Sequence, residues 1–408
     1  MTTAQPVFVS EAPRATRVAS IDIFRGLTMA VMIFVNDLDG VQGLPWWTHH
    51  AKANIDVMTY VDMVFPFFLF IIGLSMPLAI QQRLKKNPSM PQLWLHVLIR
   101  SVSLVALGVI LANAGKGSAA LMHMSPYAWT LLALLGMALF LSVYPSNGRH
   151  ANLHKWLRLG GLALALVMFA IFRRVTHDGH VAWLSFSYLE ILGLIGCTYF
   201  AVSLLYIPTR RWPWASLAWF IVLVAFSSLC SAKIIVFEHS FPLYVWPFGD
   251  GTMAFVTMAG IVTSVVFIGE ERWQTLRNKL LLGSAFGIAS LIAGYFLTPL
   301  GISKIRDTPT WGLYSVGAAV LLFTALFWLC DVKRQTSWAA FVHPAGANTL
   351  LTYLLPDVWY FLTALLGFKW FELHLNSGLP GALRSAIFTA LMLAIAGVLL
   401  RMRVRLQL

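Results

Sequence analysis

Charged residues, cysteines and the motifs of soluble enzymes are scarce in this sequence of 408 residues. Only 11% of the residues are charged, whereas soluble globular domains carry about 25%, so a water-exposed globule of this size is excluded. The three cysteines, Cys197, Cys230 and Cys330, lie within apolar runs and lack metal-ligand spacing, so no disulfide framework or zinc site is predicted. Residues 1–20 are polar and contain no apolar core segment, so we expect no cleaved signal peptide. We also find no P-loop, no dinucleotide-binding glycine fingerprint, no nucleophile elbow and no nucleic-acid-binding motif.

Long apolar runs dominate the chain instead. Hydrophobic residues make up 59% of the sequence, and its mean hydropathy is +0.75. A helix that crosses the hydrocarbon core of a membrane needs about 20 mostly apolar residues. Twelve runs approach this length, at residues 21–38, 61–82, 94–114, 125–144, 155–173, 186–206, 213–234, 250–269, 278–298, 311–330, 346–366 and 380–401. We therefore predict an all-α, polytopic membrane helical bundle of about twelve transmembrane helices, forming one domain over residues 21–401 with tails at residues 1–20 and 402–408.

The distribution of basic residues predicts the orientation of these spans. The chain has 29 Lys and Arg residues against 16 Asp and Glu, a net charge of +13. The N-terminal tail, the even-numbered gaps between spans and the C-terminal tail hold 18 of the basic residues, and the odd-numbered gaps hold 9. Short loops rich in Lys and Arg stay in the cytoplasm. We therefore predict a multi-pass protein of the cell inner membrane with both termini cytoplasmic and residues 39–60 outside.

Polar side chains gather in one hairpin near the start of the chain. The first two spans and the gap between them contain Asp22, Arg25, Asn36, Asp37, Asp39, Trp46, Trp47, His49, His50, Lys52 and Asp62. Polar groups at membrane depth are costly and usually face a bundle interior or a wet cavity, which makes them functional candidates. Simpler interpretations stand beside this one. Asp22 and Arg25 can pair at a helix start, and Trp46 and Trp47 fit an interfacial aromatic belt.

Two ionisable residues lie deep within other spans. Arg100 in the third span needs a partner or a phosphate group. Asp357 in the eleventh span lies near mid-membrane by residue count, and it is either a proton-relay group or a buried neutral carboxyl. A secondary transporter of a small polar solute is therefore one hypothesis for the function. Many transporters repeat a functional element in each half, whereas the polar hairpin at residues 36–62 has no counterpart in the second half of this sequence.

Several motifs spread over most of the chain are shared with one family of membrane enzymes, and the N-terminal set agrees in order and spacing, except that Asp62 follows His50 by two residues more than expected. They are Asp22-Ile23-Phe24-Arg25-Gly26, Phe34-Val35-Asn36-Asp37, His50-Ala51, Asp62-Met63-Val64-Phe65-Pro66, Gly301-Ile302-Ser303-Lys304, Thr308-Pro309-Thr310-Trp311 and Gly346-Ala347-Asn348. With these motifs the chain resembles the heparan-α-glucosaminide N-acetyltransferase family, and it looks closest to a bacterial branch of it. The resemblance implies a multi-pass enzyme that transfers acetyl groups from cytosolic acetyl-CoA to a sugar on the far side of a membrane.

The resemblance also implies roles for individual residues. The catalytic histidine of the family falls on His50, its asparagine near the outer end of the first helix on Asn36, and its aspartate before Val-Phe-Pro on Asp62. The Gly-x-Asn that opens a late helix falls on Gly346 and Asn348. An imidazole suits acid–base work because its ordinary pKa of about 6.5 lies near physiological pH. We therefore predict His50 as general base or acetyl carrier, Asn36 as a donor to the thioester carbonyl, and Asp62 as a group that orients His50 or holds the acceptor.

The implied ligands are acetyl-CoA as co-substrate and a sugar or glycan as acceptor. The phosphates of the donor require basic side chains, and we expect no metal and no nucleic acid. Candidates for binding the donor are Arg25, Arg100 and Asn348, and candidates for binding the acceptor are Asp37, Trp46, Asp250 and Lys304. The resemblance further suggests a homodimer in contact with membrane lipid. The sequence departs from human-type members at Gly193-Leu194, where they have Gln-Arg, and it leaves N- and O-acetylation both open.

Overall fold

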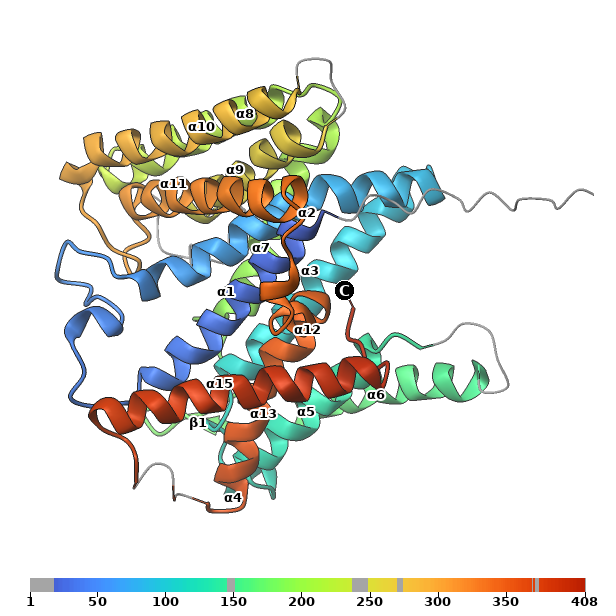
Figure 1. Cartoon of the computed structure of the whole chain (residues 1–408). Coiled ribbons are helices and arrows are strands. Elements are labelled where there is room, and N and C mark those ends of the chain that lie inside the picture. The colour runs from blue at the N-terminus through green and yellow to red at the C-terminus, as the bar shows by residue number, and fades with distance from the viewer. Residues whose placement is uncertain are drawn as a thin grey trace, which may run out of the picture.

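The computed structural model describes residues 18–144, 151–236, 249–269, 274–368, 370 and 374–407. Most of the predicted N-terminal tail, residues 1–17, lies outside the described residues. The described chain is almost entirely helical, as Figure 1 shows, which confirms the predicted all-α polytopic bundle. The one described sheet is a small antiparallel hairpin of β1 (Arg174–Val175) and β2 (Val181–Ala182).

Each predicted span coincides with a helix. These helices are α1 (Ala19–Leu38), α2 (Val64–Lys86), α3 (Met90–Ala112), α5 (Pro126–Leu141), α6 (Ala151–Ile171), α7 (Glu190–Thr209), α8 (Ala215–Ser231), α9 (Thr252–Ile268), α10 (Leu276–Phe296), α11 (Pro309–Leu326), α13 (Thr349–Leu365) and α15 (Gly378–Arg401). Between them lie the short helices α4 (Ala119–Met122) and α12 (His343–Ala347), and 3₁₀ turns at Trp46–Thr48, Tyr60–Met63, Thr298–Leu300 and Ser337–Ala339. A π-helical turn, Phe327–Val332, continues α11.

The helices differ in length. Among the described residues, eight are long and apolar enough to cross a membrane, and α5, α8, α9 and α13 are shorter apolar helices of 10–17 residues. The chain is therefore a multi-pass membrane protein. Local geometry shortens some of the predicted spans. α9 begins at Thr252 rather than residue 250, because Gly251 takes a positive φ of 94° and Asp250 Oδ1 accepts a hydrogen bond from the Thr252 N–H at 2.9 Å.

The helices form three groups in Figure 1. α8, α9, α10 and α11 lie together at the top, α5, α6, α13 and α15 lie at the bottom, and α1, α2, α3 and α7 lie between them. α2 packs along α9, α3 along α7, and α1 against α12 and α15. Glycines permit the closest of these contacts, as is common between membrane helices. A Cβ on Gly73 of α2 would lie 1.8 Å from the Thr257 carbonyl oxygen of α9.

The same argument accounts for one departure from the human-type sequences. Gly193 on α7, at the position of the first residue of the human-type Gln-Arg pair, packs against Gly108 on α3. A Cβ on Gly108 would lie 2.1 Å from the Leu189 carbonyl oxygen and 2.7 Å from the Gly193 Cα. A Cβ on Gly193 itself would lie 2.6 Å from the Leu189 Cβ and 3.6 Å from the Gly108 Cα, so a side chain at this position meets the start of α7 as well as α3.

The connections separate into two sets at opposite ends of the bundle. Residues 39–60 and the α10–α11 connection lie at the left of Figure 1, and the turn between α2 and α3 lies at the right. At the first end Asp56 pairs with Arg306, and the Gln42 N–H donates to the Asn376 carbonyl at 3.0 Å. All these residues belong to odd-numbered gaps, as expected for helices that alternate in direction.

Contacts at the other end join segments from the even-numbered gaps and both ends of the described chain. The Asp331 carboxylate caps the start of α1, accepting hydrogen bonds from the backbone N–H groups of Ala19 at 2.8 Å and Ser20 at 3.0 Å. The strand-like residues Ser142 and Leu406 pair with each other. The start of α1 and the end of α15 therefore belong to the same end of the bundle, as the predicted even number of spans requires.

Candidate active site

His50 is held in place by a buried carboxylate. Its Nδ1 lies 2.7 Å from Asp62 Oδ1, and Asp62 is only 1% exposed. Thr59 and Asp62 form a capping box at the 3₁₀ turn before α2, in which the Thr59 N–H donates to Asp62 Oδ2 at 3.0 Å. A carboxylate at Nδ1 fixes the orientation of an imidazole and leaves Nε2 available for proton transfer.

Further hydrogen bonds fix Asp62 itself. The Ala51 N–H donates to Oδ2 at 3.2 Å, and the Trp311 indole N–H donates to the Asp62 carbonyl at 3.0 Å. Trp311 is buried at the start of α11, so the carboxylate is tied to the loop, to its own turn and to a distant helix. Of the two roles predicted for Asp62, this geometry favours the orientation of His50, because its side-chain oxygens are already occupied.

Lys304 lies close to both nitrogens of the imidazole. Its Nζ is 3.4 Å from both ring nitrogens of His50. Burial lowers the pKa of Lys304, and the charges of Asp62 and Asp39 offset part of this effect. The segment that carries Lys304 is anchored to the 39–60 loop, since Arg306 pairs with Asp56. The hydrogen bond from Arg306 lowers the pKa of Asp56, together with one from the Ile302 N–H.

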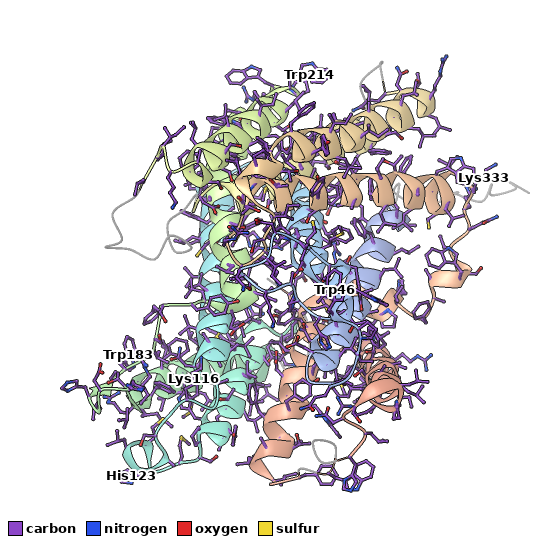
Figure 2. All side chains as sticks on the ribbon, turned by 90° about the vertical axis from the view of Figure 1, so that its left-hand side faces the viewer. Trp46, Lys116, His123, Trp183, Trp214 and Lys333 are labelled. Atoms are coloured by element: carbon purple, nitrogen blue, oxygen red, sulfur yellow. The ribbon has the colours of Figure 1, made fainter. Side chains whose placement is uncertain are left out.

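A cavity of about 660 Å³ opens beside these groups. Its polar wall includes His50, Tyr188, Thr198, Asp250, Lys304, Arg306 and Asp307, and its apolar wall includes Phe65, Ile191, Leu194, Cys197, Met253, Ala254 and Trp311. The cavity therefore runs from the connections at one end of the molecule into the space between α2, α7, α9 and α11. Figure 2 looks onto this end, with Trp46 on the segment in front.

Asp250 and Asp307 form a second titratable group in this cavity. Burial raises the pKa of Asp250 to about 6, and burial together with the charge of Asp250 raises the pKa of Asp307 well above its usual value. Asp250 is among the residues predicted to bind the acceptor, whereas Asp307 is not. The only sequence signal for Asp307 is the short charged segment with Lys304 and Arg306 between two apolar spans.

Asn36 and Asp37 lie in a different place from His50. Both line a second cavity, of about 600 Å³, between α1, α13 and α15. Asp37 Oδ1 accepts a hydrogen bond from the Tyr360 hydroxyl at 2.7 Å, and its Oδ2 accepts one from the Ser385 hydroxyl at 2.7 Å and lies 3.2 Å from Arg384. Asp37 thus ties three helices together. The structure brings His50, Asp250 and Lys304 to one cavity, with Asp62 buried behind His50, and leaves Asn36 and Asp37 in the other.

The two candidate tryptophans lie at the surface. Trp46 is 66% exposed and Trp47 is 52% exposed. The Trp47 ring lies 6.3 Å from the Tyr60 ring, centroid to centroid. Neither tryptophan lines the two cavities described above, so their arrangement fits the interfacial interpretation.

The three candidates for donor binding have different surroundings. Arg25 lies 3.5 Å from Asp22 and donates to Ser75 Oγ at 2.7 Å. Asn348 is buried, and its side chain donates to the Val404 carbonyl at 2.9 Å and accepts from the Leu406 N–H at 3.2 Å. Both residues therefore hold segments of the chain together.

Arg100 differs from Arg25 and Asn348 because one of its nitrogens lacks a hydrogen-bond partner among the described residues. Its guanidinium lies 4.6 Å from the centre of the Tyr199 ring. Among the described residues, its buried Nε has no hydrogen-bond partner. Tyr199 follows Thr198, which lines the cavity beside His50. Asp357, the candidate proton relay, lines neither of the two cavities.

Comparisons with known proteins agree with the resemblance stated above. The family model described as "Domain of unknown function (DUF5009)" matches residues 17–266. Heparan-alpha-glucosaminide N-acetyltransferase from Mus musculus is 32% identical over 123 residues, which is 30% of this chain and 17% of the relative. The protein of the same name from Homo sapiens is 32% identical over 121 residues, with the same coverage. The predicted similarity is confirmed, and the chain covers about 17% of the length of these relatives.

Proposed function

Since the chain belongs to the family described as "Domain of unknown function (DUF5009)", we propose its function from its own cavity and from its two acetyltransferase relatives. It transfers an acetyl group from cytosolic acetyl-CoA to a sugar or amino sugar on the opposite side of the membrane. The observation that carries this proposal is the pairing of His50 with the buried Asp62 at 2.7 Å on the wall of a cavity that runs into the helix bundle.

The reaction needs a base, and His50 is the proposed one. Its Nε2 removes a proton from the attacking amine or hydroxyl while Asp62 stabilises the imidazolium that forms. The acceptor then bonds to the acetyl carbon, the carbon–sulfur bond breaks, and the imidazolium returns the proton to the leaving thiolate of CoA. A general base contributes about 10²–10⁴-fold to such a step.

The developing oxyanion needs a donor, and Lys304 is better placed than Asn36. Asn36 lines the other cavity, whereas the Lys304 ammonium lies 3.4 Å from the His50 ring. A cation in a partly dehydrated cavity stabilises negative charge more strongly than it does in water. We therefore assign to Lys304 the contact with the thioester carbonyl that the sequence analysis predicted for Asn36.

The apolar wall of the cavity suits the arm of the donor. The cavity wall continues along α7 through Leu194, Cys197 and Thr198. The next residue on that helix is Tyr199, and the guanidinium of Arg100 on α3 lies over its ring. A long, thin pantetheine arm fits such a path between helices, whereas charged phosphates do not cross lipid. We therefore propose that Arg100 binds the acetyl-CoA molecule near its phosphate groups.

The test is acetyl transfer in sealed proteoliposomes of one known orientation. With acetyl-CoA on the face that exposes Lys86 and glucosamine on the face that exposes Lys52, mass spectrometry should detect acetylated sugar. His50→Ala should lower the rate by about 10²–10⁴-fold. It also leaves the buried Asp62 Oδ1 without its partner, at a cost of about 1–3 kcal/mol, so the rates are compared below the unfolding temperatures of both proteins. His49→Ala is the matched control and should change the rate only a few-fold. Transfer with both substrates confined to one face, or full activity of His50→Ala, would contradict the proposal.

A further inference from the structure

Two carboxyl groups that the acetyl transfer itself does not require share the cavity with His50. Asp250 precedes α9 and Asp307 precedes α11, and both line the cavity wall. Their carboxyl groups are hydrogen-bonded to each other. One oxygen of Asp307, Oδ1, is buried and has no hydrogen-bond partner among the described residues. A buried polar atom without a partner is costly, so it calls for an explanation such as a ligand.

The surrounding backbone holds this pair in one geometry. The Asp250 carboxylate accepts from the Thr252 N–H at 2.9 Å, and the Thr252 hydroxyl donates to the Asp307 carbonyl at 2.7 Å. The same hydroxyl lies 2.6 Å from Ser227 Oγ on α8. Asp307 also takes a left-handed conformation with φ of 52°, which is unfavourable for a residue other than glycine. Such strain persists where the surroundings fix it, and it is frequent at functional sites.

The charge of the cavity suits a cation. Two carboxyl groups in contact share one proton, because both cannot ionise at so short a distance. The Asp250–Asp307 pair then carries one negative charge and Asp62 another, Lys304 carries one positive charge, and Arg306 is neutralised by Asp56. The sum over these groups is one negative charge. The other titratable groups near the pair are Tyr188, Cys197 and Cys230, which are neutral at pH 7 when unperturbed.

Resting on the proposed acetyl transfer, we propose that Asp250 and Asp307 bind the amino group of the acceptor as an ammonium and take its first proton. An ammonium has no lone pair and cannot attack the thioester. When its proton moves to the carboxylate, a neutral amine with a free electron pair remains beside His50. The electron pair of the amine nitrogen forms the bond to the acetyl carbon, and the thiolate of CoA leaves. His50 then moves the second nitrogen proton to the thiolate. The first proton returns to water before the next turnover.

Because the Asp250–Asp307 pair removes the first proton and His50 the second, we expect the site to prefer acceptors with an amino group. A hydroxyl acceptor loses only one proton, and His50 suffices to remove it. An amino sugar arrives protonated and loses two, so it needs a second base. The Asp250–Asp307 pair therefore favours an acceptor amine over a hydroxyl, because only the ammonium needs its first proton removed.

The experiment compares glucosamine with glucose as acceptors, using full-length protein in detergent or nanodiscs with acetyl-CoA. The wild type should prefer glucosamine. Asp307→Asn and Asp250→Asn should each lower the ratio of kcat/KM for glucosamine to that for glucose by about 100-fold at pH 7. Raising the pH should rescue the variants tenfold per pH unit until the free amine predominates, whereas the wild type should change less. Asp178→Asn alters an exposed carboxyl of the β1–β2 turn and should match the wild type.

The outcomes separate this inference from the proposed function. If the wild type acetylates neither sugar, the proposed function fails. If it acetylates glucosamine but both variants keep the wild-type ratio and pH profile, the inference alone fails. A loss that is equal for both acceptors and is not rescued by pH would indicate a structural role and would also overturn it. Should Asp307→Asn not fold, as judged by its unfolding temperature, Asp250→Asn carries the test.

Discussion

At the scale of single residues, Asp62 contributes more than one contact. Its carboxylate accepts from His50, Ala51 and Thr59, and its carbonyl accepts from Trp311. The carboxylate therefore orients the proposed base and fixes the end of the 39–60 loop at the same time. The stability of this region and the geometry of the reaction depend on the same atoms.

We expect Asp62→Asn to lower both activity and stability. The amide can accept at one oxygen only, so at least one of the three donors loses its partner, at a cost of about 1–3 kcal/mol. The imidazole also loses the charge that stabilises its protonated form, so kcat should fall by about 100-fold or more. Thermal unfolding and acetyl transfer measure the two effects. Asp39→Asn, an exposed carboxyl nearby, should leave both nearly unchanged, and an equal response of the two variants would refute this role for Asp62.

At the scale of helices, glycines decide how closely the central elements pack. Gly73 on α2 faces Thr257 and Gly260 of α9, and any side chain there meets backbone rather than a flexible group. Phe65 on α2 and Met253 on α9 line the cavity beside His50. The spacing of these two helices therefore sets the width of that cavity.

Gly73→Ala should consequently destabilise the protein. Its Cβ would lie 1.8 Å from the Thr257 carbonyl oxygen, and overpacking of this kind costs about 1–3 kcal/mol or more. Gly160→Ala on α6 is the matched control, because its Cβ would meet nothing within 4 Å and alanine favours a helix over glycine by up to about 1 kcal/mol. Unfolding temperatures in detergent should fall for Gly73→Ala and stay level or rise for Gly160→Ala. The reverse order would show that α2 and α9 do not pack as described.

At the scale of the whole molecule, the loops divide into two ends. The odd-numbered connections bring Asp56 to Arg306 and His50 to Lys304, and the even-numbered ones bring Asp331 to the start of α1. The 18 to 9 division of basic residues in the sequence predicts that the second end is cytoplasmic. It also predicts that the cavity with His50 opens toward the outside.

This orientation predicts opposite accessibility for Lys52 and Lys86. Cys197, Cys230 and Cys330 are first replaced by alanine, and a single cysteine is introduced at either lysine position. In intact cells an impermeant thiol reagent should label Lys52→Cys, and it should label Lys86→Cys only after the membrane is opened. Labelling of both positions in intact cells would refute the assignment of the two ends.

The sequence by itself determined the helices and the local part of the site. Runs of about 20 apolar residues can satisfy their backbone only as helices within a membrane, so the twelve predicted spans and the twelve helices coincide in the described residues. Thr59 and Asp62 lie three residues apart, so their capping box is also a local contact. The pairing of His50 with Asp62 spans only one loop.

Only the tertiary structure decided which distant groups join His50. Lys304 lies 254 residues away in sequence, and it reaches the imidazole because helices of alternating direction return every second connection to the same end. Asn36 and Asp37 also lie at that end. The rotation of α1 against α13 and α15 nevertheless turns them into the other cavity, since each residue advances about 100° around a helix. No local pattern fixes that rotation, because it results from the packing of side chains contributed by helices far apart in the chain.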